Sequence, residues 1–160
     1  MTRRILALAG LLLASLASPL PVGAQATSSV PPALAAAGVQ RFVFDGWAGP
    51  ALPVWYVRPA RAGPGAPVLF VMHGVRRDAD RYVGEWVDLA TRHGLVVVVP
   101  EFSEASFPRA LNYNHGRLVT DTGAPRPRSE WSFAVIEPLF DAMVARERLK
   151  ARDYVLYGHS

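Results

Sequence analysis

The sequence predicts an α/β fold, with a mostly parallel sheet covered by helices on both faces and an antiparallel strand pair before it. Three short segments are continuously apolar: Val68–Met72, Leu95–Val99 and Tyr154–Tyr157. Strands that are apolar on both faces are typical of parallel sheets buried between helices. Two segments with helical spacing separate these strands, which gives the order strand, helix, strand, helix, strand.

Composition is that of an ordinary globular chain and limits the possible partners. The 160 residues are 51% hydrophobic and 19% charged, which fits at most one domain. The 17 basic residues slightly outnumber the 13 acidic ones and are spread along the chain, so nucleic acid and anionic membranes are not expected partners. The chain has no cysteine, which excludes disulfides, thiolate metal sites, a cysteine nucleophile and a lipidated cysteine anchor.

The N-terminal segment, residues 1–26, has the pattern of a secretory signal peptide. Arg3 and Arg4 precede an apolar run, Ile5–Ala17, and small residues follow with an A-x-A pattern at Ala24–Ala26. The run is too short to span a bilayer comfortably, and the alternative is a buried N-terminal helix. We therefore expect export to the periplasm or the medium, with cleavage after Ala26 or, as a second choice, after Ala24.

Residues 27–38 are rich in Ser, Pro and Ala and are predicted to form a linker before a domain over 39–160. This domain begins with two short segments of alternating polarity, Gln40–Phe44 and Pro53–Val57. Turn-forming residues separate them, namely Gly46, Gly49 and Pro50. Together these segments predict an antiparallel strand pair.

Two amphipathic helices are predicted between the apolar strands. The first covers Asp80–His93, with Asp80 as a possible N-cap and Gly94 as the C-terminal stop. The second carries apolar residues on one face: Val135, Ile136, Leu139, Phe140, Met143 and Val144. Pro138 either makes that helix start late or kinks it.

The segment from Glu101 to Ser129 has no clear periodicity. It follows a predicted parallel strand, so it begins at the carboxyl edge of the sheet, where such folds bind ligands. Long irregular segments in compact domains are often functional. We therefore expect Phe102, Phe107 or Tyr113 to line a substrate pocket.

Gly158-His159-Ser160 directly follows the third apolar strand. In the G-x-S-x-G elbow of serine hydrolases, a sharp turn after a strand lifts the nucleophilic serine above the sheet edge. Only the first three positions of that motif are present here, and a bare G-x-S also arises by chance. Its position after a buried parallel strand favours Ser160 as a nucleophile.

His73 and Gly74 end the first apolar strand. In hydrolases with such an elbow, the loop after an earlier strand donates one backbone N–H to the oxyanion hole. We expect this donor in the Gly74–Val75 loop, with Val75 as the best candidate. The His73 ring is expected to hold the loop in place rather than to transfer protons.

These segments resemble α/β-hydrolase esterases, nearest to the poly(3-hydroxybutyrate) depolymerase-like and feruloyl-esterase-like group. The resemblance is carried by Pro67–Gly74, by Leu89–Gly94, by Val98–Glu101 and by Gly158–Ser160. It covers about residues 39–160, the N-terminal half of that fold up to the nucleophile elbow. The resemblance implies Ser160 as the nucleophile, an acid and a histidine in the second half, a small-molecule or polymeric ester substrate, and neither a metal nor an organic cofactor.

The remaining titratable residues supply no triad partner. His93 is expected at the C-terminal end of a helix, where its side chain interacts favourably with the helix dipole. His115 either lines a pocket or is solvated. Asp121 and Asp153 precede Ser160, whereas the order in this fold is serine, acid, histidine. We expect the complete protein to hydrolyse esters and the 160-residue chain alone to be inactive; the alternative is a non-catalytic binding module.

Overall fold

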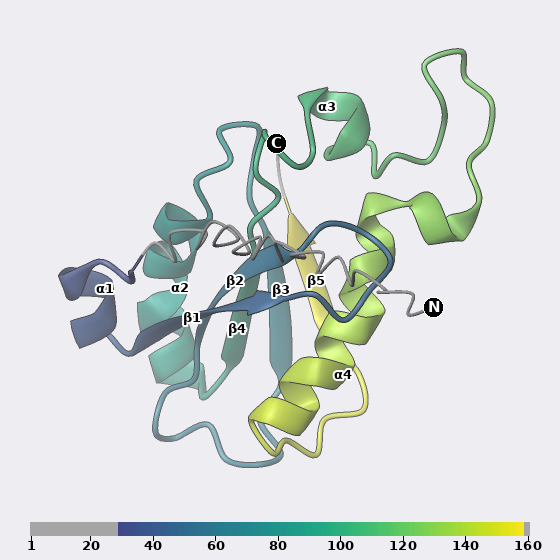
Figure 1. Cartoon of the computed structure of the whole chain (residues 1–160). Helices are drawn as coiled ribbons and strands as arrows, with labels where there is room; N and C mark the ends of the chain where they lie inside the picture. Colours follow the sequence, from purple (N-terminus) through teal and green to yellow (C-terminus); the bar gives the residue numbers. More distant parts are fainter. Residues whose placement is uncertain (1–28, 159–160) are drawn as a thin grey trace, which may run out of the picture.

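Five strands form one mixed sheet in the order β1-β2-β4-β3-β5 (Figure 1). The structure, a computed structural model, describes residues 29–158. The predicted signal peptide and the predicted nucleophile Ser160 therefore lie outside the described residues.

The strand pairings follow the predicted architecture. β1 (Val39–Phe44) and β2 (Leu52–Val57) are antiparallel, and β2 is also antiparallel to β4 (Val96–Pro100). β3 (Val68–Met72) runs parallel to both β4 and β5 (Val155–Gly158). This confirms the three predicted parallel neighbours, including the position of the last apolar strand beside the first.

Residues 29–158 also form four α-helices and two 3-10 helices. They are α1 (Pro32–Ala36), α2 (Ala79–His93), α3 (Arg109–Asn112), η1 (Arg128–Glu130), η2 (Ser132–Val135) and α4 (Ile136–Arg146). The segment predicted as a linker thus contains the short helix α1, and its Leu34 packs against the core on the α2 side of the sheet. Among the described residues, no helix is long and apolar enough to cross a bilayer.

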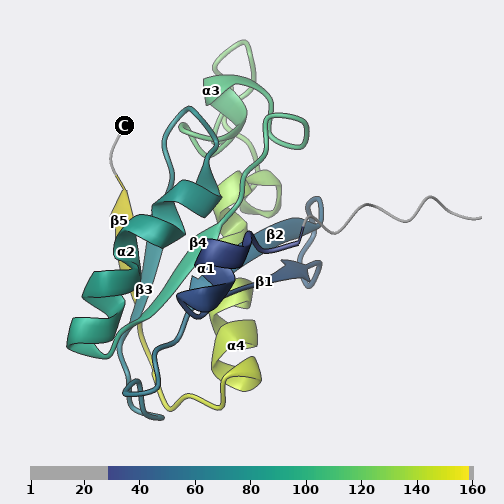
Figure 2. The ribbon, with the colours of Figure 1, turned by 90° about the vertical axis from the view of Figure 1, so that its left-hand side faces the viewer.

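The sheet separates two hydrophobic cores, as the continuous apolar strands predict. Phe70 of β3 is buried on the face covered by α4, together with Leu139. The next residue, Val71, is buried on the opposite face with Val83 of α2. Alternate side chains of one strand point to opposite faces, so each of these strands needs apolar residues at every position. Figure 2 shows α2 and α4 on opposite sides of the sheet.

The start of α2 differs from the prediction. The helix begins at Ala79, so Asp80 lies inside its first turn and does not cap it. Asp78 precedes the helix instead, and its carboxylate accepts a hydrogen bond from Arg81 Nε at 2.7 Å without capping a backbone N–H. This contact with Arg81 holds the pKa of Asp78 below its usual value. The predicted stop is confirmed, because Gly94 has φ 66° and its N–H donates to Ala90 O.

Pro138 lies in the first turn of α4. A proline is tolerated there because the N–H groups of the first turn have no intrahelical partner. The helix thus starts late, after the 3-10 turn η2, and this was the first of the two alternatives that the sequence left open.

Candidate active site

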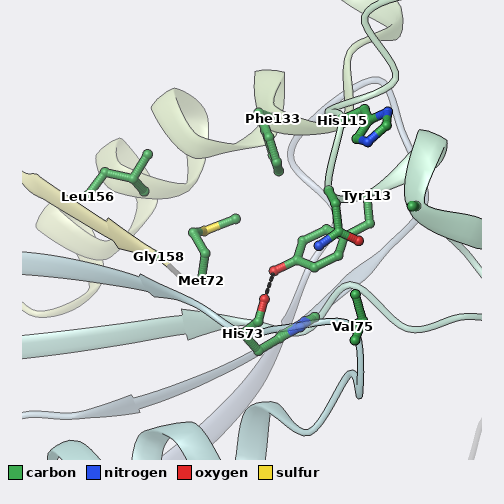
Figure 3. Close-up of a pocket in the computed structure, with 10 residues that line it drawn as sticks. Met72, His73, Val75, Tyr113, His115, Phe133, Leu156 and Gly158 are labelled. Carbon is green, nitrogen blue, oxygen red and sulfur yellow. Dashed lines mark hydrogen bonds between the residues drawn. The ribbon is translucent and has the colours of Figure 1, made fainter. Parts of the chain in front are cut away.

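A cavity of about 690 Å³ lies at the carboxyl edge of β3 and β5 (Figure 3). Its walls come from three parts of the chain that are distant in sequence. Met72 ends β3, Leu156 belongs to β5, and Tyr113 and His115 belong to the long segment after β4. The sheet topology thus gathers at one edge the segments that the sequence associates with chemistry.

The strand register brings Gly158, the first residue of the predicted Gly-His-Ser elbow, to this edge. Gly158 pairs with Met72, so β5 and β3 end side by side. A Cβ atom at position 158 would lie 3.2 Å from Met72 Cβ, which is tighter than most packed contacts. A glycine therefore suits the first position of the Gly-His-Ser triplet, because it allows close approach of β5 to β3.

The His73 ring is buried and makes two hydrogen bonds. Its Nε2 accepts from the backbone N–H of Phe102 at 3.0 Å, so Nε2 carries no proton. Nδ1 lies 3.0 Å from Gly74 O and is therefore the protonated nitrogen, which donates to that carbonyl. Burial lowers the pKa of His73, which favours this neutral form. The ring holds two loops together, as expected from the sequence, and is not available as a general base.

The turn after β3 presents the predicted oxyanion donor. The N–H of Arg77 donates to Gly74 O at 3.2 Å and closes the turn. Val75, within the turn, lines the cavity and is 66% exposed. Within residues 29–158 its N–H donates no hydrogen bond, as an oxyanion donor requires before substrate arrives.

The three aromatic residues predicted to line a substrate pocket have different positions. Tyr113 lines the cavity, and its hydroxyl donates to His73 O at 2.5 Å. Phe102 and Phe107 are buried in the core on the α4 side and do not line this cavity. Their rings are 4.8 Å apart in an edge-to-face contact, and Phe102 also stacks on Tyr113 at 4.8 Å. The long segment thus uses these two aromatic residues to anchor itself on the sheet.

Solved structures with the same arrangement identify the fold. Poly(aspartic acid) hydrolase-1 from Sphingomonas sp. KT-1 is 45% identical, with a TM-score of 0.73 over 77% of this chain and 47% of that chain. LpqC, a poly(3-hydroxybutyrate) depolymerase from Bordetella parapertussis, is 32% identical, with a TM-score of 0.69 over 79% of this chain and 44% of that chain. The described residues match part of the α/β-hydrolase fold. The chain spans less than half the length of either of these two proteins.

A more distant structure shares only the fold. Acetyl xylan esterase from Aspergillus awamori is 10% identical, with a TM-score of 0.56 over 75% of this chain and 42% of that chain. No protein-family model matches the sequence, and no curated protein sequence matches it significantly.

His115 and Phe133 also line the cavity. His115 is exposed to solvent and also lines the cavity, so the two alternatives left open by the sequence, pocket lining and solvation, are both correct. Phe133 packs edge-to-face on Tyr113, with ring centroids 6.1 Å apart. It lies in η2, just before the predicted helix, and nothing in the local pattern distinguishes it from a core residue.

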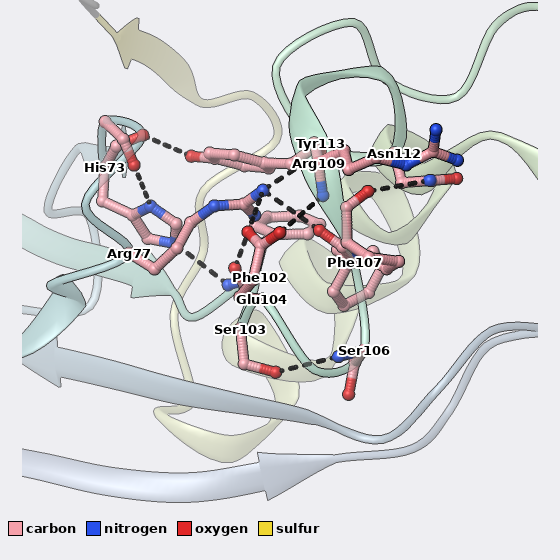
Figure 4. Close-up of polar contacts among 12 residues, drawn as sticks. His73, Arg77, Phe102, Ser103, Glu104, Ser106, Phe107, Arg109, Asn112 and Tyr113 are labelled. Atoms are coloured by element: carbon pink, nitrogen blue, oxygen red, sulfur yellow. Dashed lines mark hydrogen bonds and ion pairs between the residues drawn. The ribbon is translucent and has the colours of Figure 1, made fainter.

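Arg77 closes the turn after β3, and its contacts were not predicted from the sequence. Its guanidinium donates to the carbonyls of Phe102, Phe107 and Arg109, at 2.7, 3.0 and 3.2 Å (Figure 4). It also forms an ion pair with Glu104, 3.1 Å from Nη2 to Oε2. A second arginine, Arg76, precedes it and is exposed.

The described residues contain no group of three or more His, Cys, Asp or Glu side chains that could hold a metal ion.

Proposed function

We propose that the complete protein that includes this chain is a serine hydrolase that cleaves carboxylic esters by acyl transfer, with Ser160 as the nucleophile. The observation that carries the proposal is the parallel pairing of β5 with β3. This pairing brings the Gly158 end of β5 and the His73–Arg77 turn to the same rim of one open cavity. A nucleophile and an oxyanion donor must both lie within reach of one carbonyl group.

In the proposed mechanism, Ser160 Oγ attacks the ester carbonyl while a base removes the hydroxyl proton. The carbonyl oxygen becomes an oxyanion, which accepts hydrogen bonds from the N–H of Val75 and of the residue after Ser160. Each such donor typically contributes about 3–4 kcal/mol. The alcohol leaves with a proton, and water then attacks the acyl-enzyme and releases the acid.

The base and its orienting acid are assigned to the part of the complete protein beyond the described residues. Both ring nitrogens of His73 are already hydrogen-bonded within the fold. His93 ends α2, just before β4 begins, and so lies at the edge of the sheet opposite the carboxyl end of β4. Since an unactivated serine hydroxyl is a poor nucleophile, we propose that the 160-residue chain alone is inactive.

The cavity favours a substrate with an apolar portion beside its carbonyl group. Met72, Phe133 and Leu156 contribute apolar side chains to its wall. An aliphatic polyester such as poly(3-hydroxybutyrate), named for one relative, fits this chemistry. The 45% identity to a poly(aspartic acid) hydrolase supports a second candidate, cleavage of the amide bonds of that polymer by the same acyl transfer.

The test pairs a short-chain aryl ester assay with a serine-directed phosphonate probe. The complete protein should hydrolyse the ester and label at Ser160, and Ser160→Ala should do neither. Ser129→Ala, at an exposed serine, is the matched control and should behave as wild type. Labelling at another serine, or unchanged turnover in Ser160→Ala, would show that the nucleophile is wrong. If the wild type neither hydrolyses nor labels, the non-catalytic binding module gains support.

The two polymer classes are separated by incubating the same enzyme with poly(3-hydroxybutyrate) and with poly(aspartic acid). Soluble hydroxy acids released from the first polymer would support the ester assignment. Release of aspartate oligomers alone would favour the amide-cleaving alternative.

We also propose that the protein is exported, because residues 1–26 have the charged start, apolar core and small-residue site of a signal peptide. N-terminal sequencing of the mature protein should begin at Thr27, or at Gln25 if the second cleavage site is used. An intact Met1 on mature protein would contradict export by cleavage.

A further inference from the structure

We propose that Arg77 is a positioning residue that fixes the Val75 N–H as an oxyanion donor. The inference rests on the proposed function and adds to it a residue that does not touch substrate. Arg77 does not line the cavity, whereas Val75 does. Its effect on catalysis must therefore pass through the turn that both residues share.

The backbone of Arg77 is in an unusual conformation. Its φ is 59°, in the left-handed region that residues other than glycine rarely adopt. The Arg77 N–H donates to Gly74 O and closes the turn around Val75, and the left-handed backbone of Arg77 sets the direction in which the chain leaves that turn. A non-glycine residue keeps this backbone conformation only when contacts around it stabilise it, because the conformation is unfavourable by itself.

The contacts of the Arg77 guanidinium stabilise this conformation. Only 9% of the Arg77 side chain is exposed, and its two terminal nitrogens reach three backbone carbonyls of the segment after β4. The guanidinium carbon also lies 4.4 Å from the centre of the Tyr113 ring. A planar fork with several donors can make all these contacts at once, whereas a lysine ammonium is a single point of charge.

The same segment also holds the other end of the turn. The Phe102 N–H donates to the His73 ring, and Tyr113 Oη donates to His73 O. Val75 lies between these two anchors, His73 and Arg77, and its own side chain is mostly exposed. The position of its N–H is therefore set by its neighbours, and removing one anchor frees the donor.

The test compares Arg77→Met and Arg77→Lys in the complete protein with Arg76→Met as the matched control. Arg76 is the adjacent exposed arginine and makes none of these contacts. The readouts are kcat and KM for a neutral aryl ester, and the rate of phosphonate labelling at Ser160. The labelling rate reports on the oxyanion hole, because the phosphonyl oxygen occupies the place of the oxyanion.

For Arg77→Met we expect kcat to fall by about 10- to 100-fold, since misplacing a catalytic group by about 1 Å has effects of that order. The phosphonate labelling rate should fall in parallel, and KM should stay within about threefold, because ground-state binding needs no oxyanion donor. Arg77→Lys should show a smaller fall in the same two quantities, and Arg76→Met should match wild type. A kcat within about twofold of wild type, or a change confined to KM, would overturn the inference.

Circular dichroism distinguishes loss of the donor from loss of the fold. If Arg77→Met is unfolded, Arg77→Lys decides, and a wild-type kcat and labelling rate in a folded Arg77→Lys protein would overturn the inference. Inactivity of the wild type would overturn both the proposed function and this inference. If the wild type is active and Arg77→Met has the same activity, only this inference is overturned.

Discussion

The backbone N–H of Phe102 donates a hydrogen bond to Nε2 of the buried His73, over 3.0 Å. This contact joins the residues just after β4 to those just after β3, two neighbouring parallel strands. It also fixes the tautomer of His73, because an accepting nitrogen cannot carry a proton. Protonation of Nε2 would break this hydrogen bond. We therefore expect the stability of the fold to depend on pH through His73.

The first prediction concerns stability at mildly acidic pH. Burial lowers the pKa of His73 below its unfolded value of about 6.5, so the unfolded state takes up the proton first as pH falls. The stability that the neutral ring contributes is present above pH 6.5 and is lost as the pH falls from there through the folded-state pKa. Urea unfolding of the complete protein between pH 8 and pH 5 should show this decline.

The matched variant for this prediction is His73→Gln. Its amide can accept the Phe102 N–H but does not titrate, so the decline attributed to His73 should be absent even if the variant is less stable at pH 8. An identical pH dependence in wild type and His73→Gln would show that other groups cause the decline.

The second prediction isolates the hydroxyl of Tyr113. Tyr113→Phe keeps the ring but removes the donor to His73 O, which leaves a buried carbonyl without that partner. The free energy of unfolding should fall by about 1–3 kcal/mol. Chemical denaturation measures this loss, and Phe133→Leu, which alters the neighbouring ring without touching the hydrogen bond, is the comparison.

Because the Tyr113 phenol is buried, we also expect a loss of stability at alkaline pH. Burial raises its pKa above the ordinary value of about 10, so the folded state keeps the proton longer than the unfolded state. The resulting stability is present below pH 10 and is lost as the pH rises above it. Tyr113→Phe should show a smaller loss between pH 9 and pH 11 than wild type, and equal losses would contradict the assignment.

The third prediction concerns His115, which lines the cavity but is not expected to transfer the proton of Ser160. His115→Ala should change KM for aryl esters several-fold and leave kcat within about threefold of wild type, as loss of a ground-state contact does. A loss of kcat of about 10³-fold or more, together with loss of phosphonate labelling, would instead identify His115 as the base.

The fourth prediction concerns the exposed face of β5 in the 160-residue chain. Val155, Leu156 and Tyr157 are 60%, 55% and 41% exposed, and contiguous apolar surface on an edge strand promotes association. Light scattering should therefore show oligomers of the chain, and Val155→Lys should reduce them. Val43→Lys, at an exposed valine of the other edge strand β1, should have less effect. A monomeric wild-type chain would contradict the prediction.

Much of the fold follows from local patterns. The strands β3 and β4 are continuously apolar because both their faces are buried, and this predicted a parallel sheet between helices. The start of α2 was missed by one residue because Asp78 and Asp80 are equally plausible caps, and neither caps the helix. The helix α1 was missed because a five-residue helix in a Pro- and Ala-rich segment has too little periodicity to detect.

The site was predictable where it depends on strand ends and not where it depends on side-chain packing. The order of strands places Gly74, Val75 and Gly158 at one edge. No pattern shows whether an aromatic residue of an irregular segment faces a cavity or the core, and in the structure Phe102 and Phe107 are buried in the core while Tyr113 lines the cavity. Arg77 was missed because its role depends on a positive φ and on carbonyls 25 to 32 residues away.

The pairing of β3 with β5 has a consequence for how the molecule folds. Leu69 pairs with Val155, and everything from α2 to α4 lies between them in the chain. Closing so long a loop is entropically costly, and contacts of this kind form more slowly than local ones. The hairpin of β1 and β2 requires no such closure. We therefore expect this edge of the cavity to form later than the β1–β2 hairpin, and during synthesis on the ribosome it can form only once β5 has emerged.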